Sequence, residues 1–127
     1  MSVSSKTRRV LVVDDEIDIT NVFKSALEAH GFSVDAFTDP REALEHFKPN
    51  FYDISILDIK MPHMTGFQLS RAMIKIDKDT RICFVTAFEI YEKEARAMLP
   101  SLSSFCFIKK PISVSALVEH IRSHLVA

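Results

Sequence analysis

Polar residues follow four short apolar runs of this chain, at the point where each run ends. They are Asp14 and Asp15 after the first run, Asp58 after the second, Thr86 after the third, and Lys109 and Lys110 after the fourth. If the runs are parallel strands, their carboxyl ends meet at one edge of the sheet, where open α/β sheets bind ligands. We therefore expect three carboxylates, a hydroxyl group and a lysine to converge at that edge.

This set of side chains is suited to phosphoryl chemistry. Clustered carboxylates repel one another and have raised pKa values unless a cation lies among them. A few carboxylate oxygens, with waters retained, suit Mg²⁺ better than zinc or copper. A nearby lysine and hydroxyl group can neutralise and hydrogen-bond phosphoryl oxygens. One carboxylate can then act as the nucleophile and form an aspartyl phosphate.

The apolar runs predict the strands that position these groups. Residues 10–13, 54–57, 82–85 and 105–108 are apolar without alternation, which is typical of strands covered on both faces of a parallel sheet. Residues 32–37 alternate and predict a weaker edge strand. These patterns indicate five strands.

Helical patterns fill the intervals between the strands. Apolar residues in 19–27 fall at helical spacing, and Gly31 is placed to end that helix. Helices are predicted to start at Asp39-Pro40 and Thr65-Gly66, to span 89–99, and to start again at Ser113. Strand and helix alternate five times, so we predict an α/β fold with a parallel sheet and right-handed crossovers. We expect a polar tail over 1–8 and a single domain over 9–126; alternation leaves the strand order open.

Composition excludes several classes of function. The 127 residues are 47% hydrophobic and 26% charged with a net charge of −1, which gives no reason to expect direct binding to nucleic acid or to an anionic membrane. Two glycines are too few for phosphate-binding loops. No apolar stretch approaches the roughly 18 residues of a membrane span. Cys83 and Cys106 lie in apolar runs, and we expect buried, reduced thiols in a cytoplasmic protein.

The chain resembles, over essentially its full length, the receiver domain of two-component response regulators. The motifs that carry the resemblance are Leu-Val-Val-Asp-Asp-Glu at 11–16, Leu-Asp-Ile-Lys-Met-Pro-His-Met-Thr-Gly at 57–66, Thr-Ala at 86–87 and Lys-Pro at 110–111. Each motif is weak alone, but their order and their places at strand ends make a specific combination. The resemblance implies a flavodoxin-like (CheY-like) three-layer sandwich with five helices and sheet order 2-1-3-4-5.

The resemblance also implies a magnesium-dependent phosphoacceptor site. Asp58 would accept a phosphoryl group from a sensor histidine kinase or a phosphotransfer protein. Asp15 and Asp58 would bind Mg²⁺ directly, Asp14 through water, and Lys60 through its backbone carbonyl. The domain would assist its own phosphorylation and dephosphorylation without being an enzyme in the ordinary sense.

Two further residues would contact the phosphoryl oxygens, Thr86 by a hydrogen bond and Lys110 by its charge. The Lys110-Pro111 peptide bond would be cis, a form that is affordable before proline, and Lys109 would be solvated. Lys60 and the bulky Phe88 would flank the approach of hydrolytic water, so we expect them to tune dephosphorylation.

A conformational switch is implied as well. Thr86 would move toward the phosphate and Phe107 would turn inward behind it, repacking the face made by the fourth helix, fifth strand and fifth helix. That face would bind a downstream effector, a fused output domain or a second copy of the chain. Phe107 replaces the tyrosine commoner in the family, so no hydroxyl group is available there.

Other functions stay open at this stage. The domain could act unphosphorylated as a scaffold. An aspartate-nucleophile phosphatase usually has a second acid two residues after the nucleophile, whereas this chain has Lys60. A flavin site would need a loop rich in Ser, Thr or Gly after the first strand. His120 and His124 share a helix face, but with no third ligand evident we expect them to be solvated.

Overall fold

The computed structural model describes residues 8–87 and 105–125 of the chain. Strands and helices follow one another in the order β1 Arg9–Val13, α1 Ile17–Ala29, β2 Ser33–Phe37, α2 Pro40–His46, β3 Ile54–Asp58, α3 Gly66–Ile76, β4 Ile82–Thr86, β5 Phe105–Lys109 and α5 Val114–Leu125. The five predicted strands are confirmed, as are four of the predicted helices. The helix predicted over 89–99 lies outside the described residues.

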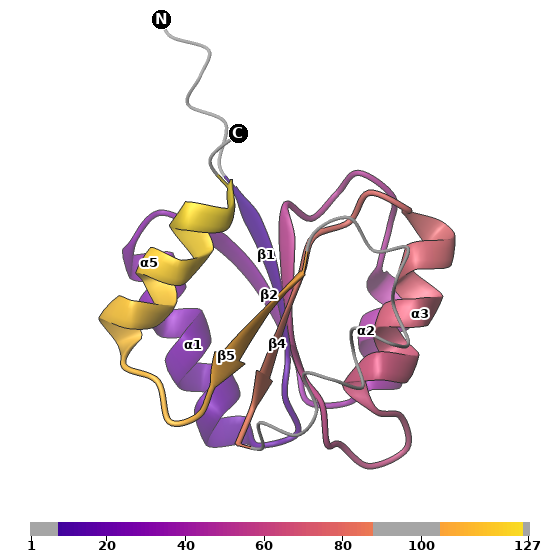
Figure 1. Ribbon diagram of the computed structural model, residues 1–127, viewed down its shortest axis with the longest axis horizontal. Helices are drawn as coiled ribbons and strands as arrows, with labels where there is room; N and C mark the ends of the chain where they lie inside the picture. The colour runs from indigo at the N-terminus through magenta and orange to yellow at the C-terminus, as the bar shows by residue number, and fades with distance from the viewer. Residues whose placement is uncertain (1–7, 88–104, 126–127) are drawn as a thin grey trace, which may run out of the picture.

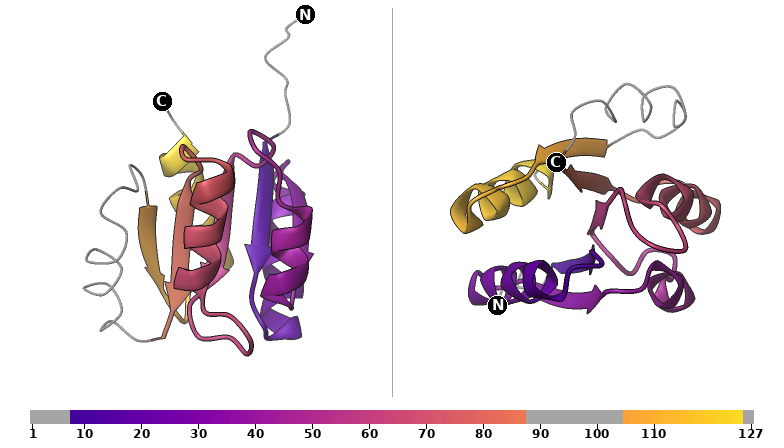
Figure 2. Two further views of the ribbon diagram at one scale, coloured as in Figure 1. Left: turned by 90° about the vertical axis from the view of Figure 1, so that its right-hand side faces the viewer. Right: turned by 90° about the horizontal axis from the view of Figure 1, so that it is seen from below.

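The strands form one parallel sheet in the order β2-β1-β3-β4-β5. This confirms the order implied by the family resemblance. Helices α1 and α5 cover one face and α2 and α3 the other, which gives three layers (Figure 1). The view from below shows the strands in a row between the two pairs of helices (Figure 2). The crossovers bring every strand's carboxyl end to the same edge.

Both faces of the sheet carry a hydrophobic core. Val10 and Val12 of β1 contribute to the core beneath α1 and α5, whereas Leu11 and Val13 contribute to the core beneath α2 and α3. All four side chains are fully buried. Because successive side chains of a strand point to opposite faces, a strand covered on both faces must be apolar at every position.

Helix ends form where the sequence predicts them. Gly31 follows α1 with a φ of 93°, which an L side chain rarely adopts. Thr65 and Gln68 form a reciprocal capping box at the start of α3. The Ser113 hydroxyl accepts a hydrogen bond of 3.1 Å from the Ala116 amide at the start of α5. None of the helices in 8–87 and 105–125 has the length and apolar character needed to cross a membrane.

The start of α3 packs directly on the backbone that follows β3. The Gly66 amide donates to the Ile59 carbonyl over 2.8 Å. A Cβ atom at Gly66 would overlap the backbone carbonyl of Asp58 and approach Ile59 Cα to 3.0 Å. Glycine is therefore required here so that the helix can close over the end of β3.

The expectation of two reduced thiols is wrong. Cys83 of β4 and Cys106 of β5 are joined by a disulfide. They are register partners on adjacent strands, with Cα atoms 4.5 Å apart. Strand register, which their separation of 23 residues does not reveal, brings them together.

We expect alanine to lower the free energy of unfolding more at Gly66 than at Gly31. Gly66→Ala should lower the free energy of unfolding by about 3 kcal/mol, because the rigid backbone of β3 cannot move away from the added methyl group. Gly31→Ala is the matched control, since nothing lies within 4 Å of the added Cβ. It should cost about 1–2 kcal/mol from its left-handed backbone alone. Urea unfolding measures both, and equal losses would contradict the steric argument.

Candidate functional site

Three carboxylates meet at the carboxyl-end edge of the sheet. One oxygen from each of Asp14, Asp15 and Asp58 lies within 4.8 Å of the other two. Asp14 and Asp58 are buried, with 2% and 7% of their surface exposed, while Asp15 is exposed. Asp14 directly follows β1, and Asp58 is the last residue of the neighbouring β3. The fold thus brings together carboxylates from two central strands.

The Lys110 ammonium group reaches into this cluster from the end of β5. Its Nζ lies 3.0 Å from Asp14 Oδ2, 3.5 Å from Asp58 Oδ2 and 3.6 Å from Glu16 Oε1. The lysine side chain is itself 15% exposed. The Lys110-Pro111 peptide bond is cis. The structure therefore places the predicted lysine among the predicted carboxylates.

Backbone amides hold the two buried carboxylates, and a buried hydroxyl holds the backbone of Asp14. The Ile59 amide donates to Asp58 Oδ1 over 2.9 Å, and the Glu16 amide donates to Asp14 Oδ1 over 3.0 Å. The Thr20 hydroxyl donates to the Asp14 backbone carbonyl over 2.8 Å. The supporting role of Thr20 and the ion pair of Glu16 are not evident from the sequence. The acidic run at 14–16 was a signal for Glu16, but Thr20 was indistinguishable from an ordinary helix residue.

The electrostatics of the cluster favour a bound cation. Burial and, after it, the nearby charge of Asp14 raise the pKa of Asp58 from 3.8 to about 7, although the charge of Lys110 acts to lower it. Burial works to lower the pKa of Lys110, but the hydrogen bond to Asp14 and the charges of Asp58, Asp14 and Glu16 outweigh it, so this pKa is raised. One lysine does not balance the closely spaced acids.

The donor set fits Mg²⁺. Carboxylate oxygens are the ligands that this hard cation prefers, and partial exposure at Asp15 allows it to keep several waters. A divalent ion would also supply the positive charge that the raised pKa of Asp58 shows to be lacking. Asp14, Asp15 and Asp58 are therefore chemically able to hold the ion.

Thr86 and Phe107 lie on β4 and β5, the strands next to β3 and at the sheet edge. Thr86 is buried at the end of β4, and its carbonyl accepts a hydrogen bond of 2.8 Å from the Lys110 amide. Phe107 is half-buried, and its ring centroid lies 5.4 Å from that of Phe84. Lys60 is exposed just beyond β3. Phe88 lies outside the described residues.

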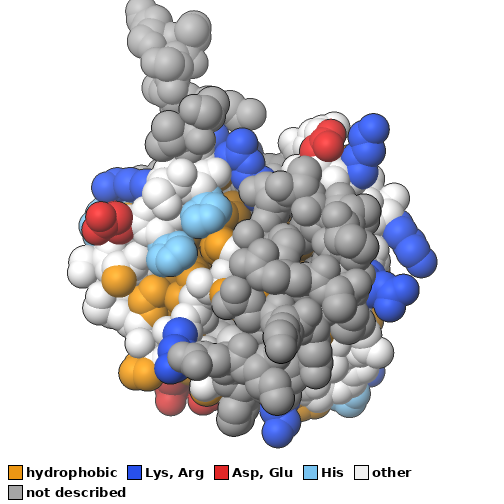
Figure 3. Space-filling model, in the orientation of Figure 1, with side chains coloured by type: hydrophobic (Ala, Val, Ile, Leu, Met, Phe, Trp, Pro, Cys, Tyr) orange, Lys and Arg blue, Asp and Glu red, His pale blue; other side chains and the backbone are white. Residues whose placement is uncertain are grey.

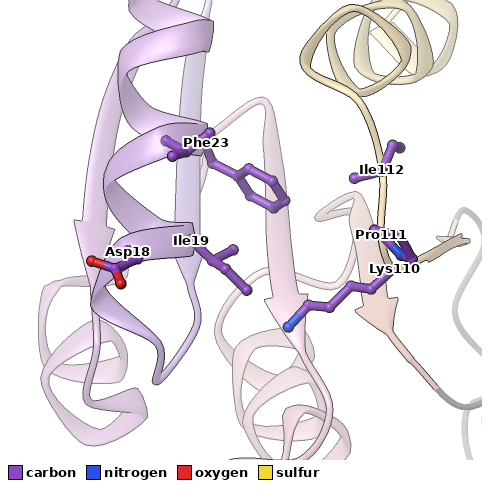
Figure 4. A pocket seen from close by; sticks show the side chains of 7 residues that line it. Asp18, Ile19, Phe23, Lys110, Pro111 and Ile112 are labelled. Carbon is purple, nitrogen blue, oxygen red and sulfur yellow. The ribbon is translucent and has the colours of Figure 1, made fainter.

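An apolar hollow adjoins the site on the α1 side. It has a volume of about 300 Å³ and is lined by Asp18, Ile19, Val22, Phe23, Lys110, Pro111 and Ile112. Figure 4 shows Ile19 and Phe23 projecting from α1 toward the segment that carries Lys110, Pro111 and Ile112. Ile17 and Val22 at this end of the molecule are 57% and 51% exposed. Lys110 thus borders both the acidic cluster and the hollow.

Comparison with known proteins establishes the family. The response regulator receiver domain model matches residues 10–122, and the chain belongs to this family, the receiver domains of two-component response regulators. The response regulator receiver protein CpdR of Brucella abortus is 29% identical over 120 residues, which cover 94% of this chain and 98% of CpdR. Regulatory protein VanRB of Enterococcus faecalis is 32% identical over 117 residues, covering 92% of this chain and 52% of VanRB.

The shared region is part of some relatives and nearly the whole of others. The C4-dicarboxylate transport transcriptional regulatory protein DctD of Rhizobium meliloti is 32% identical over 113 residues, covering 89% of this chain but 24% of DctD. The chain therefore spans about a quarter of DctD, about half of VanRB and nearly all of CpdR.

Solved structures share the fold. Response regulator TrrA of Thermotoga maritima, in complex with Mg²⁺-BeF, has a TM-score of 0.77 and 33% identity, covering 94% of this chain and 100% of TrrA. Chemotaxis protein CheY4 of Vibrio cholerae has a TM-score of 0.81 and 28% identity, also covering 94% of this chain and 100% of its own. Receiver domains of this family bind Mg²⁺ at an acidic pocket, and this chain has a cluster of aspartates at the same kind of position.

The raised pKa of Asp58 predicts a pH-dependent stability that Asp58→Asn removes. In metal-free buffer the folded wild type holds this proton up to about pH 7, whereas the unfolded chain loses it near 3.8. The contribution of Asp58 to stability therefore falls as the pH rises through this window. The variant should gain free energy of unfolding relative to the wild type at about pH 8, and less at about pH 5.

Urea unfolding at the two pH values tests this difference, with Asp18→Asn as the control because Asp18 is exposed on α1 outside the cluster. Adding Mg²⁺ at the higher pH should likewise raise the free energy of unfolding of the wild type. A variant whose pH dependence matches that of the wild type would contradict the argument.

Proposed function

We propose that this receiver domain accepts a phosphoryl group on Asp58 from the phosphohistidine of a sensor kinase or phosphotransfer protein, in a reaction that requires Mg²⁺. The observation that carries the proposal is the position of Lys110 Nζ, 3.0 Å from Asp14 and 3.5 Å from Asp58 at the carboxyl-end edge. A buried carboxylate beside a cation and further acids is suited to attack phosphorus, and much less suited to a purely structural role.

In the proposed reaction an oxygen of Asp58 attacks phosphorus while the bond from phosphorus to the donor breaks. The donor's nitrogen, or the acetate oxygen of acetyl phosphate, leaves with the electron pair. Mg²⁺ held by Asp14, Asp15, Asp58 and the Lys60 carbonyl would supply Lewis-acid stabilisation of the phosphoryl oxygens.

The chain's own groups have separate tasks in this step. The Ile59 amide, which donates to Asp58 Oδ1, leaves Oδ2 toward Lys110 as the attacking oxygen. Lys110 then exchanges its carboxylate contact for a phosphoryl oxygen, and the Thr86 hydroxyl donates to another. Lys110 Nζ already lies 3.5 Å from Asp58 Oδ2 before the reaction, so this donor needs little reorganisation.

The position of Thr86 on β4 supports a conformational switch. Thr86, Phe84 and Phe107 lie on one face of the sheet, with the Phe84 ring between α3 and Phe107. Movement of Thr86 toward a phosphate would open space at the end of that row, which Phe107 would fill. The altered α5-β5 side would bind an effector, a fused output domain or a second copy of the chain.

The apolar hollow beside Lys110 gives the phosphodonor a place to dock. A donor histidine must come within bonding distance of Asp58, so its protein must cover the surface next to Lys110. Exposed Val22 of α1 lines this hollow, and Ile17 is exposed at the start of the same helix. Apolar side chains of a helical donor domain would be buried there, whereas a small donor such as acetyl phosphate would not need them.

Asp58 is predicted to be the acceptor. Wild-type protein incubated with acetyl phosphate and Mg²⁺ should gain one phosphoryl adduct by intact mass. Asp58→Asn should abolish the adduct because an amide is not a nucleophile, and Asp18→Asn should retain it. A folded wild type that forms no adduct under any Mg²⁺ concentration would contradict the proposal and favour a scaffold that acts unphosphorylated.

The docking surface is predicted to separate large donors from small ones. Val22→Glu should slow phosphotransfer from a phosphorylated kinase that serves the wild type by about tenfold or more, since a charge would be buried without a partner. Its rate with acetyl phosphate should not change. Ile76→Glu is the matched control, because Ile76 is 42% exposed at the far end of α3. Equal slowing with both donors would place the effect in the reaction rather than in docking.

A further inference from the structure

A second cluster of possible ligands lies on the opposite face of the sheet from Phe107. One ligand atom from each of Cys83, Cys106 and His124 lies within 4.8 Å of the other two. The cysteines come from β4 and β5, and the histidine from the last turn of α5. Both cysteines belong to the core beneath α1 and α5, so this cluster is separate from the acidic site.

The surroundings combine a buried interior with a route to solvent. Cys83 is fully buried and Cys106 is 9% exposed. Leu117, Ile121 and Leu125 of α5 share their core. His124 is half-buried, and Figure 3 shows two histidine side chains side by side at the surface over α5. An ion could therefore reach the sulfur atoms past His124.

The hydrogen bonds of His124 orient it as a ligand. Its Nδ1 lies 3.0 Å from the His120 carbonyl. A carbonyl can only accept, so Nδ1 carries the proton and Nε2 keeps its lone pair. Metal-binding histidines are commonly oriented in this way, by a backbone carbonyl at the other nitrogen. Arg81 further fixes this turn, since its Nη1 donates to the His124 carbonyl over 2.7 Å.

We propose that Cys83, Cys106 and His124 bind a divalent thiophilic cation of the Zn²⁺ class when the disulfide is reduced. Thiolate and imidazole are the ligands that zinc prefers, and three protein ligands leave a fourth position to solvent. Charge decides the ion, because two thiolates, one neutral imidazole and a divalent cation sum to zero. A monovalent copper ion would leave a net negative charge in an apolar core, which is costly.

The disulfide and the metal complex exclude each other. A dithiol reductant transfers two electrons and two protons to the disulfide, gives two thiols, and is itself oxidised to a disulfide. The cation then displaces the two thiol protons as it binds. The site is thus open to metal only in the reduced protein; the disulfide links β4 to β5, and the metal complex would link both strands to α5.

Cobalt(II) is the probe, because thiolate ligation gives a charge-transfer absorption that carboxylate ligation does not. The full chain is reduced with a phosphine, which is then removed, and titrated with Co²⁺ in excess Mg²⁺ so that the acidic cluster is occupied. We expect a charge-transfer band that saturates at one equivalent and disappears when Zn²⁺ is added. The disulfide form should give no band.

Substitutions locate the ligands. Cys83→Ser and Cys106→Ser should each abolish the one-equivalent band, and His124→Gln should weaken Co²⁺ binding at least about tenfold. His120→Gln is the matched control, because His120 stacks on His124 at a centroid distance of 5.5 Å but is not in the cluster. It should bind as the wild type does, as should Asp58→Asn.

Three results would overturn the proposal. They are the lack of a band in the reduced, folded wild type, a band that survives the cysteine substitutions, and equal effects of the two histidine substitutions. Zn²⁺ should also raise the melting temperature of the reduced wild type but not of reduced Cys106→Ser, with folding checked by circular dichroism. None of these readouts depends on phosphorylation of Asp58. The metal site and the phosphoacceptor function can therefore be tested independently.

Discussion

The burial of Asp14 and Asp58 side by side is the constraint on which this molecule is built. Two carboxylates at neighbouring strand ends cannot both be ionised out of water without compensating charge. Lys110 supplies part of it, from 3.0 and 3.5 Å, and the pKa of Asp58 nevertheless stays near 7. The remaining deficit of positive charge favours a bound cation. The carboxylates cannot move apart, because the hydrophobic cores on both faces of the sheet hold the strand ends in place.

Strand order explains why these residue types occupy these places. β1 and β3 are neighbours, so short aspartates at their ends meet directly. β5 is separated from β3 by β4, a span of roughly 10 Å at the usual strand spacing. The four-carbon stem of a lysine can cross that interval, and a short side chain cannot. Threonine suits the end of β4 because it stands between the lysine and the carboxylate.

The spacing of apolar residues and the polar residues that end each run predict most of the secondary structure. They do not predict which residues lie opposite one another on neighbouring strands. Continuous apolar runs predict strands covered on both faces, and the polar residues that end them predict the acidic edge. Register is different, because it depends on how two separate strands slide past each other. That is why the pairing of Cys83 with Cys106 was missed and reduced thiols were wrongly expected. The i, i+4 spacing of His120 and His124 predicts two solvated side chains. It does not show that His124, half-buried in the structure, lies beside the two cysteines of the core.

The two faces of β4 and β5 connect the acidic site with the sulfur cluster. Alternation sends Phe84 and Phe107 to the α3 side and Cys83 and Cys106 to the α5 side of adjacent positions. A covalent or metal link between the sulfurs holds the two strands together directly behind the aromatic pair. Thr86 and Lys110 lie three and four residues farther along these strands, so the link restrains the backbone that carries them. If Phe107 repacks as proposed, a link between the sulfurs would favour rotation of its side chain over separation of β4 from β5.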